Sequence, residues 1–384
     1  MKDKLFSIID ELNTEYVKIW EDICNIESPW HCKEGVDAVG EYFIRHANAR
    51  GWRVEVFPQE RAGNVVTITA NPDAKGAPIA FSGHMDTVHA VGSFGNPPTR
   101  VAWEEDRIYG PGTTDCKGGI VVGFLAMDAL CQIGYRERPL VMYLQSDEEG
   151  GGKFSGDATI YHICEKAQGS AVFFNLEGGL SDAICIGRKG IATFEFTVHG
   201  KEAHAAGCAT NGANAICEAA YKIIELEKFK DPKGLTCCCA VINGGTKHNI
   251  VPGECKFHAN VRFATMAQLE EFTARAKELC EDIKVPGCTC EFVLPRVRPA
   301  MEVCDRNLEA VAHVNEIWKK CGLSEWKWVF NPGGTDAAFV SQAGIPALDS
   351  VGNMGGRIHT VGEYGIISSL ASQAKRLALA TLYY

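Results

Sequence analysis

Residues 141–152 read VMYLQSDEEGGG, an apolar run that ends in three acidic residues and then in three glycines. An uninterrupted apolar run of this length is typical of a strand that is buried on both faces. Similar runs occur at 54–57, 65–70, 79–82 and 171–176, and helical segments at 118–130 and 156–167 lie between the later ones. Buried strands that alternate with helices predict an α/β layer, in which ligands gather at the strand ends.

Helices are expected near both ends of the chain. Apolar residues recur at helical spacing from Leu5 to Ile19, and Ser28-Pro29 interrupts this pattern. Further helices are expected at 36–49, 308–321 and 366–382.

The pattern changes near residue 188. The elements that follow are expected in the order strand, helix, strand, strand, helix and strand, at 191–198, 214–228, 236–242, 255–263, 267–283 and 289–294. This βαββαβ order is the ferredoxin-like pattern, which closes on itself as an independent module. We therefore expect one α/β domain, formed by residues 1–187 and 297–384, that is interrupted by an inserted domain of residues 188–296.

Composition excludes several classes of protein. The net charge is -10 and no basic stripe is present, so nucleic acid is not expected as a partner. No apolar run is long enough to span a bilayer, and the first residues are too charged for a signal peptide, so a cytoplasmic protein without a membrane partner is expected.

The 17 cysteines do not suggest a disulfide framework. Their number is odd, the chain is long, and Cys237, Cys238 and Cys239 are consecutive, so we expect reduced thiols that act as small apolar side chains. No CxxC pair occurs, which excludes a zinc ribbon.

Five segments place metal-type ligands just after apolar runs or in glycine-rich loops. They contain His84 with Asp86, Asp115, the acidic run 147–149, Glu177, and His359. Taken singly, His84 with Asp86 can be a surface pair, Asp115 a helix cap and the acidic run a solvated loop, and Glu177 and His359 can be ordinary loop residues. Together they provide two histidines and three or four carboxylates, the mixed nitrogen and oxygen set that suits two zinc ions about 3.5 to 4 Å apart.

In these motifs the chain resembles the co-catalytic zinc family that includes glutamate carboxypeptidase, peptidase T, aminoacylase-1 and succinyl-diaminopimelate desuccinylase. The resemblance covers nearly the whole chain and keeps the same order. It implies a zinc-exopeptidase-like, three-layer α/β catalytic domain with a mixed sheet, interrupted by a ferredoxin-like α+β lid that also forms a homodimer. It also implies two Zn²⁺ per chain, with Co²⁺ or Mn²⁺ as alternatives.

The resemblance implies roles for the residues of the metal centre. His84 and Glu177 would hold one zinc, Glu149 and His359 the other, and Asp115 both. The peptide bond between Asp115 and Cys116 would be cis. Glu148 would be the general base and Asp86 would orient His84.

Substrate-binding roles in the inserted domain follow from the same resemblance. His204 would reach the scissile carbonyl of the neighbouring subunit, and Asn249 and Arg262 would meet the substrate, whose carboxylate Arg262 can bind in bidentate fashion. The backbone amides of Gly333, Gly334 and Thr335 would bind the same carboxylate. A structural histidine, an arginine on a sheet face and a plain turn are the alternative interpretations.

The predicted function is hydrolysis of an amide bond next to a carboxylate, in a small peptide or an N-acyl amino acid. In the family that the chain resembles, glutamate at the position of Glu177 usually accompanies carboxypeptidases and deacylases, so Glu177 favours these, although Gly178 replaces the proline that often follows in the family. An aminopeptidase or dipeptidase of the same family is the alternative. A metal-storing or thiol-redox protein is the alternative from outside the enzymes.

Overall fold

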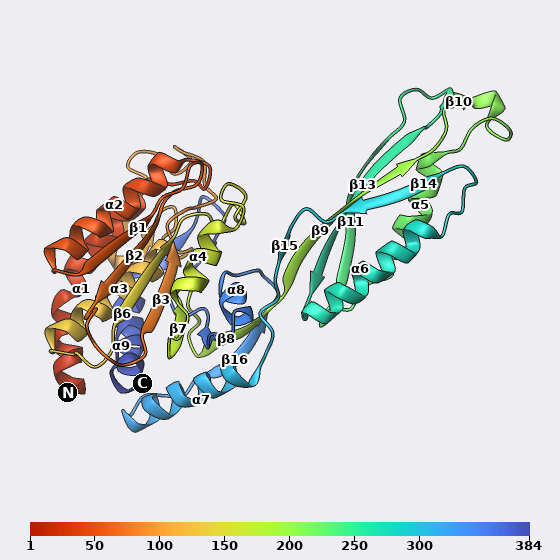
Figure 1. Ribbon diagram of the computed structural model, residues 1–384. Coiled ribbons are helices and arrows are strands. Elements are labelled where there is room, and N and C mark those ends of the chain that lie inside the picture. Colours follow the sequence, from red (N-terminus) through yellow and green to blue (C-terminus); the bar gives the residue numbers. More distant parts are fainter. The chain divides into compact units, whose positions relative to one another are not determined.

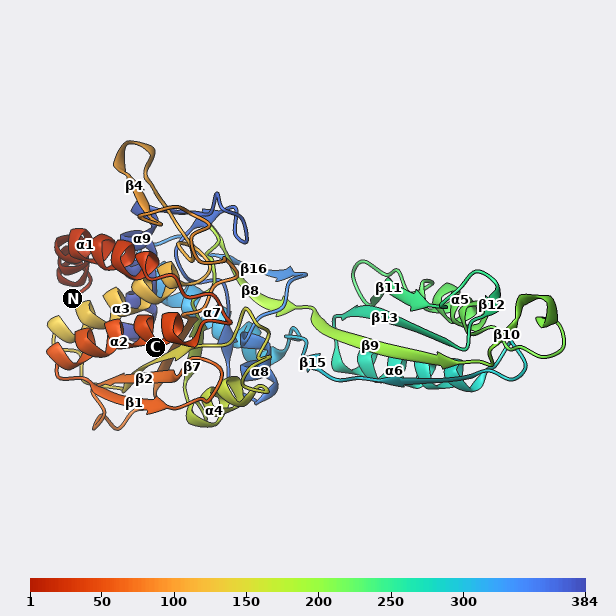
Figure 2. The ribbon, with the colours of Figure 1, turned by 90° about the horizontal axis from the view of Figure 1, so that it is seen from above.

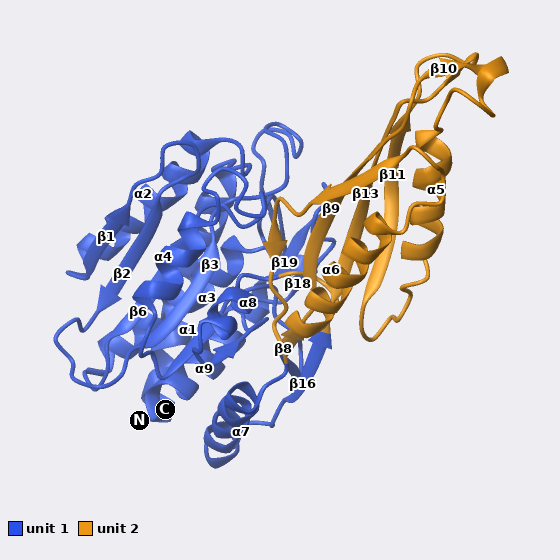
Figure 3. Ribbon diagram, turned by 45° about the vertical axis from the view of Figure 1, so that its right-hand side comes forward, with its two compact units in different colours: residues 1–186, 303–330, 335–384 blue, residues 187–302, 331–334 orange.

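The computed structural model describes residues 1–384, which form two compact units (Figure 3). Unit 1 consists of Met1–Ile186, Val303–Phe330 and Thr335–Tyr384. Unit 2 consists of Gly187–Glu302 and Asn331–Gly334. None of the helices combines the length and the apolarity that crossing a lipid bilayer requires.

Unit 1 is built on a mixed six-stranded sheet. Its strand order is β1 (Arg53–Phe57), β2 (Val65–Ala70), β6 (Leu140–Gln145), β3 (Ile79–His84), β7 (Val172–Asn175) and β17 (Ala347–Leu348). Strand β3 runs parallel to both β6 and β7, whereas β2 is antiparallel to β1 and β6. Every residue of β2, β3, β6 and β7 is buried, which explains their uninterrupted apolar sequences.

Helices cover both faces of this sheet, so the unit has three layers (Figures 1 and 2). One face carries α1 (Lys2–Asn25), α2 (Lys33–Ala49), α3 (Lys117–Gln132) and α9 (Ile367–Tyr383). The other carries α4 (Ala158–Lys166) and α8 (Ala337–Gln342), while α7 (Asp305–Lys320) packs on α9 and β17. The central helix α3 is almost wholly buried, because it packs on the sheet and on α1 and α9.

Short strands complete unit 1. A four-stranded sheet has the order β18 (Gly355–Gly356), β19 (Tyr364–Ile366), β5 (Arg107–Tyr109) and β4 (Arg100–Ala102), and the short helix η1 (Trp103–Glu105) joins β4 to β5. Strands β8 (Ala183–Arg188) and β16 (Lys327–Asn331) form a separate pair.

Unit 2 is an antiparallel sheet of four main strands and one short one, with two helices. The strand order is β11 (Thr236–Gly244), β13 (Glu254–Phe263), β9 (Gly190–His199) and β14 (Thr289–Val293), which is the ferredoxin-like order. Strand β15 (Val297–Arg298) also pairs with β9, and the short strands β10 (Ala203–His204) and β12 (Ile250–Val251) pair with each other. The short helix η2 (Ala205–Gly207) follows β10.

Burial alternates along β9 and β13, so one face of this sheet packs against α5 (Ala215–Leu226) and α6 (Met266–Glu281). The core between them is rich in phenylalanine, with Phe194, Phe196, Phe257 and Phe272 fully buried. Helix α6 begins at a capping box, in which the Thr265 side chain accepts from the backbone of Gln268 and the Gln268 side chain accepts in return.

Candidate metal centre

Three strands of the mixed sheet bring three of the five predicted ligands to one edge. Strand β3 ends at His84, β6 ends just before residues 147–149, and β7 ends two residues before Glu177. Because β3, β6 and β7 are parallel, their carboxyl ends meet at the same edge of the sheet.

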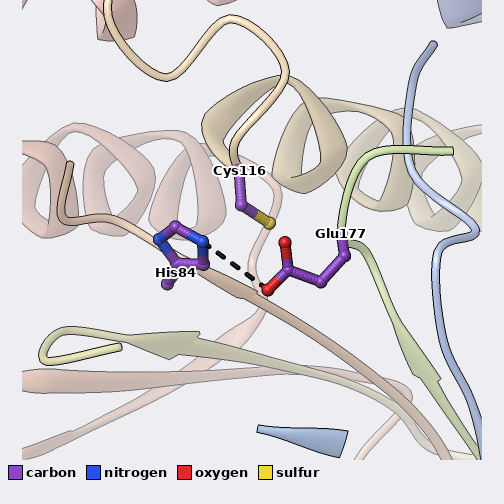
Figure 4. Close-up of side chains that lie close together, drawn as sticks. All are labelled: His84, Cys116 and Glu177. Atoms are coloured by element: carbon purple, nitrogen blue, oxygen red, sulfur yellow. Dashed lines mark ion pairs between the residues drawn. The ribbon is translucent and has the colours of Figure 1, made fainter. Parts of the chain in front are cut away.

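One group of donors surrounds His84. Its Nε2 lies 3.0 Å from Oδ1 of Asp115 and 3.6 Å from Oε1 of Glu177. Figure 4 shows the imidazole and the Glu177 carboxylate facing each other, with the thiol of Cys116 beside them. The Cys116 sulfur donates to the backbone carbonyl of Leu176 at 3.2 Å, so in this structure its hydrogen points to the backbone.

A second group surrounds His359. Its Nε2 lies 3.1 Å from Oδ2 of Asp115 and 3.4 Å from Oε2 of Glu149. The two oxygens of Asp115 therefore face different histidines, and each histidine also faces one glutamate. The peptide bond that follows Asp115 is cis, as the resemblance implies.

Asp86 fixes the orientation of its neighbours. His84 Nδ1 donates to the backbone carbonyl of Asp86 at 2.9 Å, which leaves Nε2 to face the acids. The Asp86 carboxylate is 3.5 Å from the same nitrogen and accepts from the backbone N–H groups of Glu148 (3.3 Å) and Glu149 (2.8 Å). Asp86 therefore orients His84 mainly through its backbone, and its side chain holds the acidic turn.

The protonation of the cluster reflects its excess of carboxylates. Burial raises the pKa of Glu177 to about 7, and Asp115 adds to this effect while His84 opposes it. Burial also raises the pKa of Glu149 to about 7. Asp115 and then Glu149 raise the pKa of His359 to about 10. Protons thus compensate part of a negative charge that bound cations would otherwise neutralise.

The donor set fits a pair of divalent cations. In a tetrahedral site, two ligand atoms that each lie about 2.1 Å from the cation are about 3.4 Å apart. The four separations between histidine nitrogens and carboxylate oxygens range from 3.0 to 3.6 Å. Nitrogen and oxygen ligands of this kind suit zinc, cobalt and manganese.

The predicted substrate residues of unit 2 lie in two places. His204 is exposed at the end of β10, and Asn249 is beside it, because the Asn249 carbonyl accepts from the backbone of Ala205. Arg262 is at the far end of β13, paired with Ile191, whereas Glu254 at the start of that strand is paired with His199. Eight residues of strand separate these ends, which is about 27 Å. Within one chain, unit 2 therefore does not bring His204 and Arg262 together.

The glycine-rich loop is divided between the two units. Gly333 and Gly334 belong to unit 2, where a Cβ on Gly334 would lie 3.0 Å from the Arg298 side chain and 3.0 Å from Ile191. Thr335 belongs to unit 1, where it is buried and its hydroxyl accepts from the Asn175 side chain at 3.0 Å. Ile191 therefore neighbours both Gly334 and, through the pairing of β9 with β13, Arg262.

Two polar residues that the sequence does not single out, His89 and Glu363, are buried and bonded to each other, and Glu363 also accepts from the loop that carries Asp115. Glu363 is in the same glycine-rich segment as His359, four residues later. An acidic residue in such a turn is usually exposed. Only the full burial of Glu363, which the structure shows, distinguishes it from an ordinary turn residue.

Comparisons with known proteins agree with this geometry. The profile of the family described as "Peptidase family M20/M25/M40" matches residues 80–382. Carboxypeptidase G2 of Pseudomonas sp. (strain RS-16) is 27% identical over 371 residues, which cover 95% of this chain and 88% of that protein. Succinyl-diaminopimelate desuccinylase of Wolinella succinogenes is 26% identical over 295 residues, which cover 74% of this chain and 78% of that protein.

A solved structure has the same fold. Aminopeptidase PepT from Bacillus cereus ATCC 10987 superposes with a TM-score of 0.76 at 21% sequence identity. The match covers 97% of this chain and 98% of that one.

Proposed function

The chain belongs to peptidase family M20/M25/M40, as its motifs predict, and on this basis we propose that it is a two-metal hydrolase whose active site is the cluster around Asp115. The chain is a metal-dependent hydrolase of amide bonds; its sequence relatives favour a carboxypeptidase or N-acyl-amino-acid deacylase, and an aminopeptidase or dipeptidase of the same family is the alternative. The observation that carries the proposal is the position of Asp115, because a carboxylate with one oxygen toward each of two nitrogen and oxygen donor groups suits a bridging ligand.

Two Zn²⁺ ions are the proposed cofactors, with Co²⁺ or Mn²⁺ as alternatives. His84 and Glu177 would hold one ion, Glu149 and His359 the other, and Asp115 both. When bound, two such cations polarise the scissile carbonyl and lower the pKa of the attacking water.

Glu148 is the proposed general base. It takes a proton from the attacking water and later delivers it to the leaving nitrogen. Its position beside the ligand Glu149 supports this role, since both backbone N–H groups are held by the buried Asp86 carboxylate. Asp86 is therefore proposed to position both the base and one ligand.

Unit 1 is the proposed catalytic domain and unit 2 the proposed lid and dimerisation domain. His204 and Asn249 lie at one end of unit 2 and Arg262 at the other. In a homodimer, one chain would therefore contribute His204 and Asn249 to an active site, and its partner would contribute Arg262. Arg262 and the backbone amides of Gly333, Gly334 and Thr335 would bind the carboxylate of the substrate. No disulfide is found among the 17 cysteines, which supports a cytoplasmic location.

A substrate panel tests this proposal. Purified protein loaded with zinc is offered peptides that end in glutamate, N-acetyl and N-succinyl amino acids, and peptides with a free N-terminus and a blocked C-terminus. Release of a residue that bears a free carboxylate supports a carboxypeptidase or deacylase. Cleavage of the blocked peptides alone would instead identify an aminopeptidase.

A cobalt spectrum tests the alternative of a metal-storing or thiol-redox protein. Co²⁺ bound by nitrogen and oxygen lacks the intense near-ultraviolet bands that thiolate ligation produces. Thiolate bands without any hydrolysis would favour the storage alternative.

A further inference from the structure

Glu363 is a carboxylate at the meeting point of three loops that border the metal centre. It is fully buried, although carboxylates are almost never fully buried without partners. Its Oε1 accepts from the backbone N–H of Thr114 (2.8 Å) and of Asp115 (3.0 Å). Its Oε2 accepts from the backbone N–H of Gly112 at 3.3 Å and from Nε2 of His89 at 2.8 Å.

These contacts join the segments that carry the proposed ligands. His89 follows His84 and Asp86 in the loop after β3, residues 112–115 form the loop that ends at Asp115, and Glu363 follows His359. One carboxylate group therefore links all three loops through four hydrogen bonds.

Neighbouring contacts make this junction stiff. The Glu363 carbonyl accepts from the backbone of Gly110 at 3.2 Å, and the Thr114 hydroxyl donates to the Tyr364 carbonyl at 2.7 Å. Strands β19 and β5 continue the same pairing, with Tyr364 opposite Tyr109. The segment of residues 109–115 and the segment of residues 363–366 are thus hydrogen-bonded to each other along their length. The side chain of Glu363 continues these contacts toward Asp115.

We propose that Glu363, held by His89, is a positioning residue that sets the backbone of Asp115 and the loop of His359 so that Asp115 can face both histidines. This inference rests on the proposed two-metal function. A carboxylate suits the position because it only accepts, and all four of its partners are donors. Outer partners of metal ligands change metal affinity or activity by about 10-fold to 100-fold when they are removed.

The test compares Glu363→Gln with Glu105→Gln, which changes an exposed carboxylate beside the same four-stranded sheet. In Glu363→Gln an amide donor replaces one acceptor and faces N–H groups. We expect the zinc dissociation constant, measured by chelator competition on folded protein, to rise about 10-fold to 100-fold, and kcat at saturating zinc to fall while KM changes little. Glu105→Gln should match the wild type in all three.

A second pair of variants keeps the test decisive if Glu363→Gln does not fold. His89→Gln retains an N–H donor and should bind zinc nearly as the wild type does, whereas His89→Leu should bind it more weakly. The visible spectrum of the Co²⁺ form should change in His89→Leu and not in His89→Gln.

The positioning role would be overturned if Glu363→Gln had the same zinc affinity and the same Co²⁺ spectrum as the wild type. If Glu363→Gln does not fold, the same result for both His89 variants would overturn it. A purely structural role would lower the unfolding temperature and leave the zinc affinity of the folded protein unchanged. If the wild type itself neither binds two ions nor hydrolyses any substrate, the proposed function fails instead, so the two failures can be told apart.

Discussion

The two histidines of the candidate centre have contrasting surroundings. His84 ends a buried strand and its side chain is 2% exposed, whereas the side chain of His359 is 54% exposed. The backbone of His359 has a φ of 62°, in the left-handed region that few residues other than glycine adopt. The His84 half of the site is thus part of the sheet, and the His359 half is a loop that other contacts must hold in place.

The contrast shows that two donor groups of similar chemistry can be held in place in different ways. Both histidines face the same Asp115 and one glutamate each. His84 ends β3 and Glu177 closely follows β7, so the sheet fixes both of these side chains, whereas in the second group only Glu149 follows a strand. The His359 group depends on the contacts that fix its loop, among them those of Glu363.

The largest expected effect is that of Asp115→Asn, because it changes the residue that the two halves share. Loss of bound metal from both sites should reduce turnover by about 10³-fold or more, the equivalent of several kcal/mol of transition-state stabilisation. Mass spectrometry measures the loss of metal, and kcat/KM measures the loss of turnover. Asp10→Asn, which changes an exposed carboxylate, is the control. Retention of one full equivalent of zinc would mean that the halves are independent.

Glu148→Gln should separate chemistry from metal binding. Loss of a general base typically lowers kcat by about 10²-fold to 10⁴-fold, while both ions stay bound because Glu148 is not a proposed ligand. Glu165→Gln, on the exposed face of α4, serves as the control. Unchanged kcat in Glu148→Gln would remove it from the mechanism.

Removal of each histidine should affect stability unequally. In metal-free protein, His84→Ala leaves Asp115 and Glu177 without their buried partner and should lower the free energy of unfolding by about 1–3 kcal/mol. His359→Ala also leaves Asp115 and Glu149 without a partner, but because its side chain is 54% exposed, water screens these contacts and the expected loss is smaller, about 1 kcal/mol or less. Urea unfolding of the two variants makes the comparison, and equal losses would contradict the difference between the halves.

The smallest expected effect is a difference between the rates at which the two zinc ions are released. Since His359 is the more exposed of the two histidines, an ion held by it should leave first when a chelator is added to the zinc-loaded wild-type protein. Release should therefore occur in two phases, with one equivalent of zinc in each. A single phase that releases both equivalents would show that the halves act as one unit.

The longer elements could be predicted from the sequence because burial determines their patterns. The strand expected at 255–263 is β13 (Glu254–Phe263), and the one expected at 191–198 is β9 (Gly190–His199), both with alternating burial. Strands β4, β5, β18 and β19 were not predicted. They have only two or three residues each, and long-range pairing rather than local composition defines them.

The candidate site could be predicted only in part. Motifs name the residues around Asp115, and the structure brings those side chains together, while their roles stay a prediction. The motifs also group Asn249 with Arg262, but the length of β13 keeps these two apart within unit 2. The role of Glu363 could not be predicted from the sequence, because its hydrogen-bond partners are backbone N–H groups 248 and 249 residues away in the chain.

The most direct test of the central claim is a crystal structure of zinc-loaded protein with anomalous data collected at the zinc edge. The account predicts two anomalous peaks on either side of the Asp115 carboxylate, one next to His84 and Glu177 and the other next to Glu149 and His359. A single peak, or zinc bound through cysteine sulfur elsewhere, would contradict it.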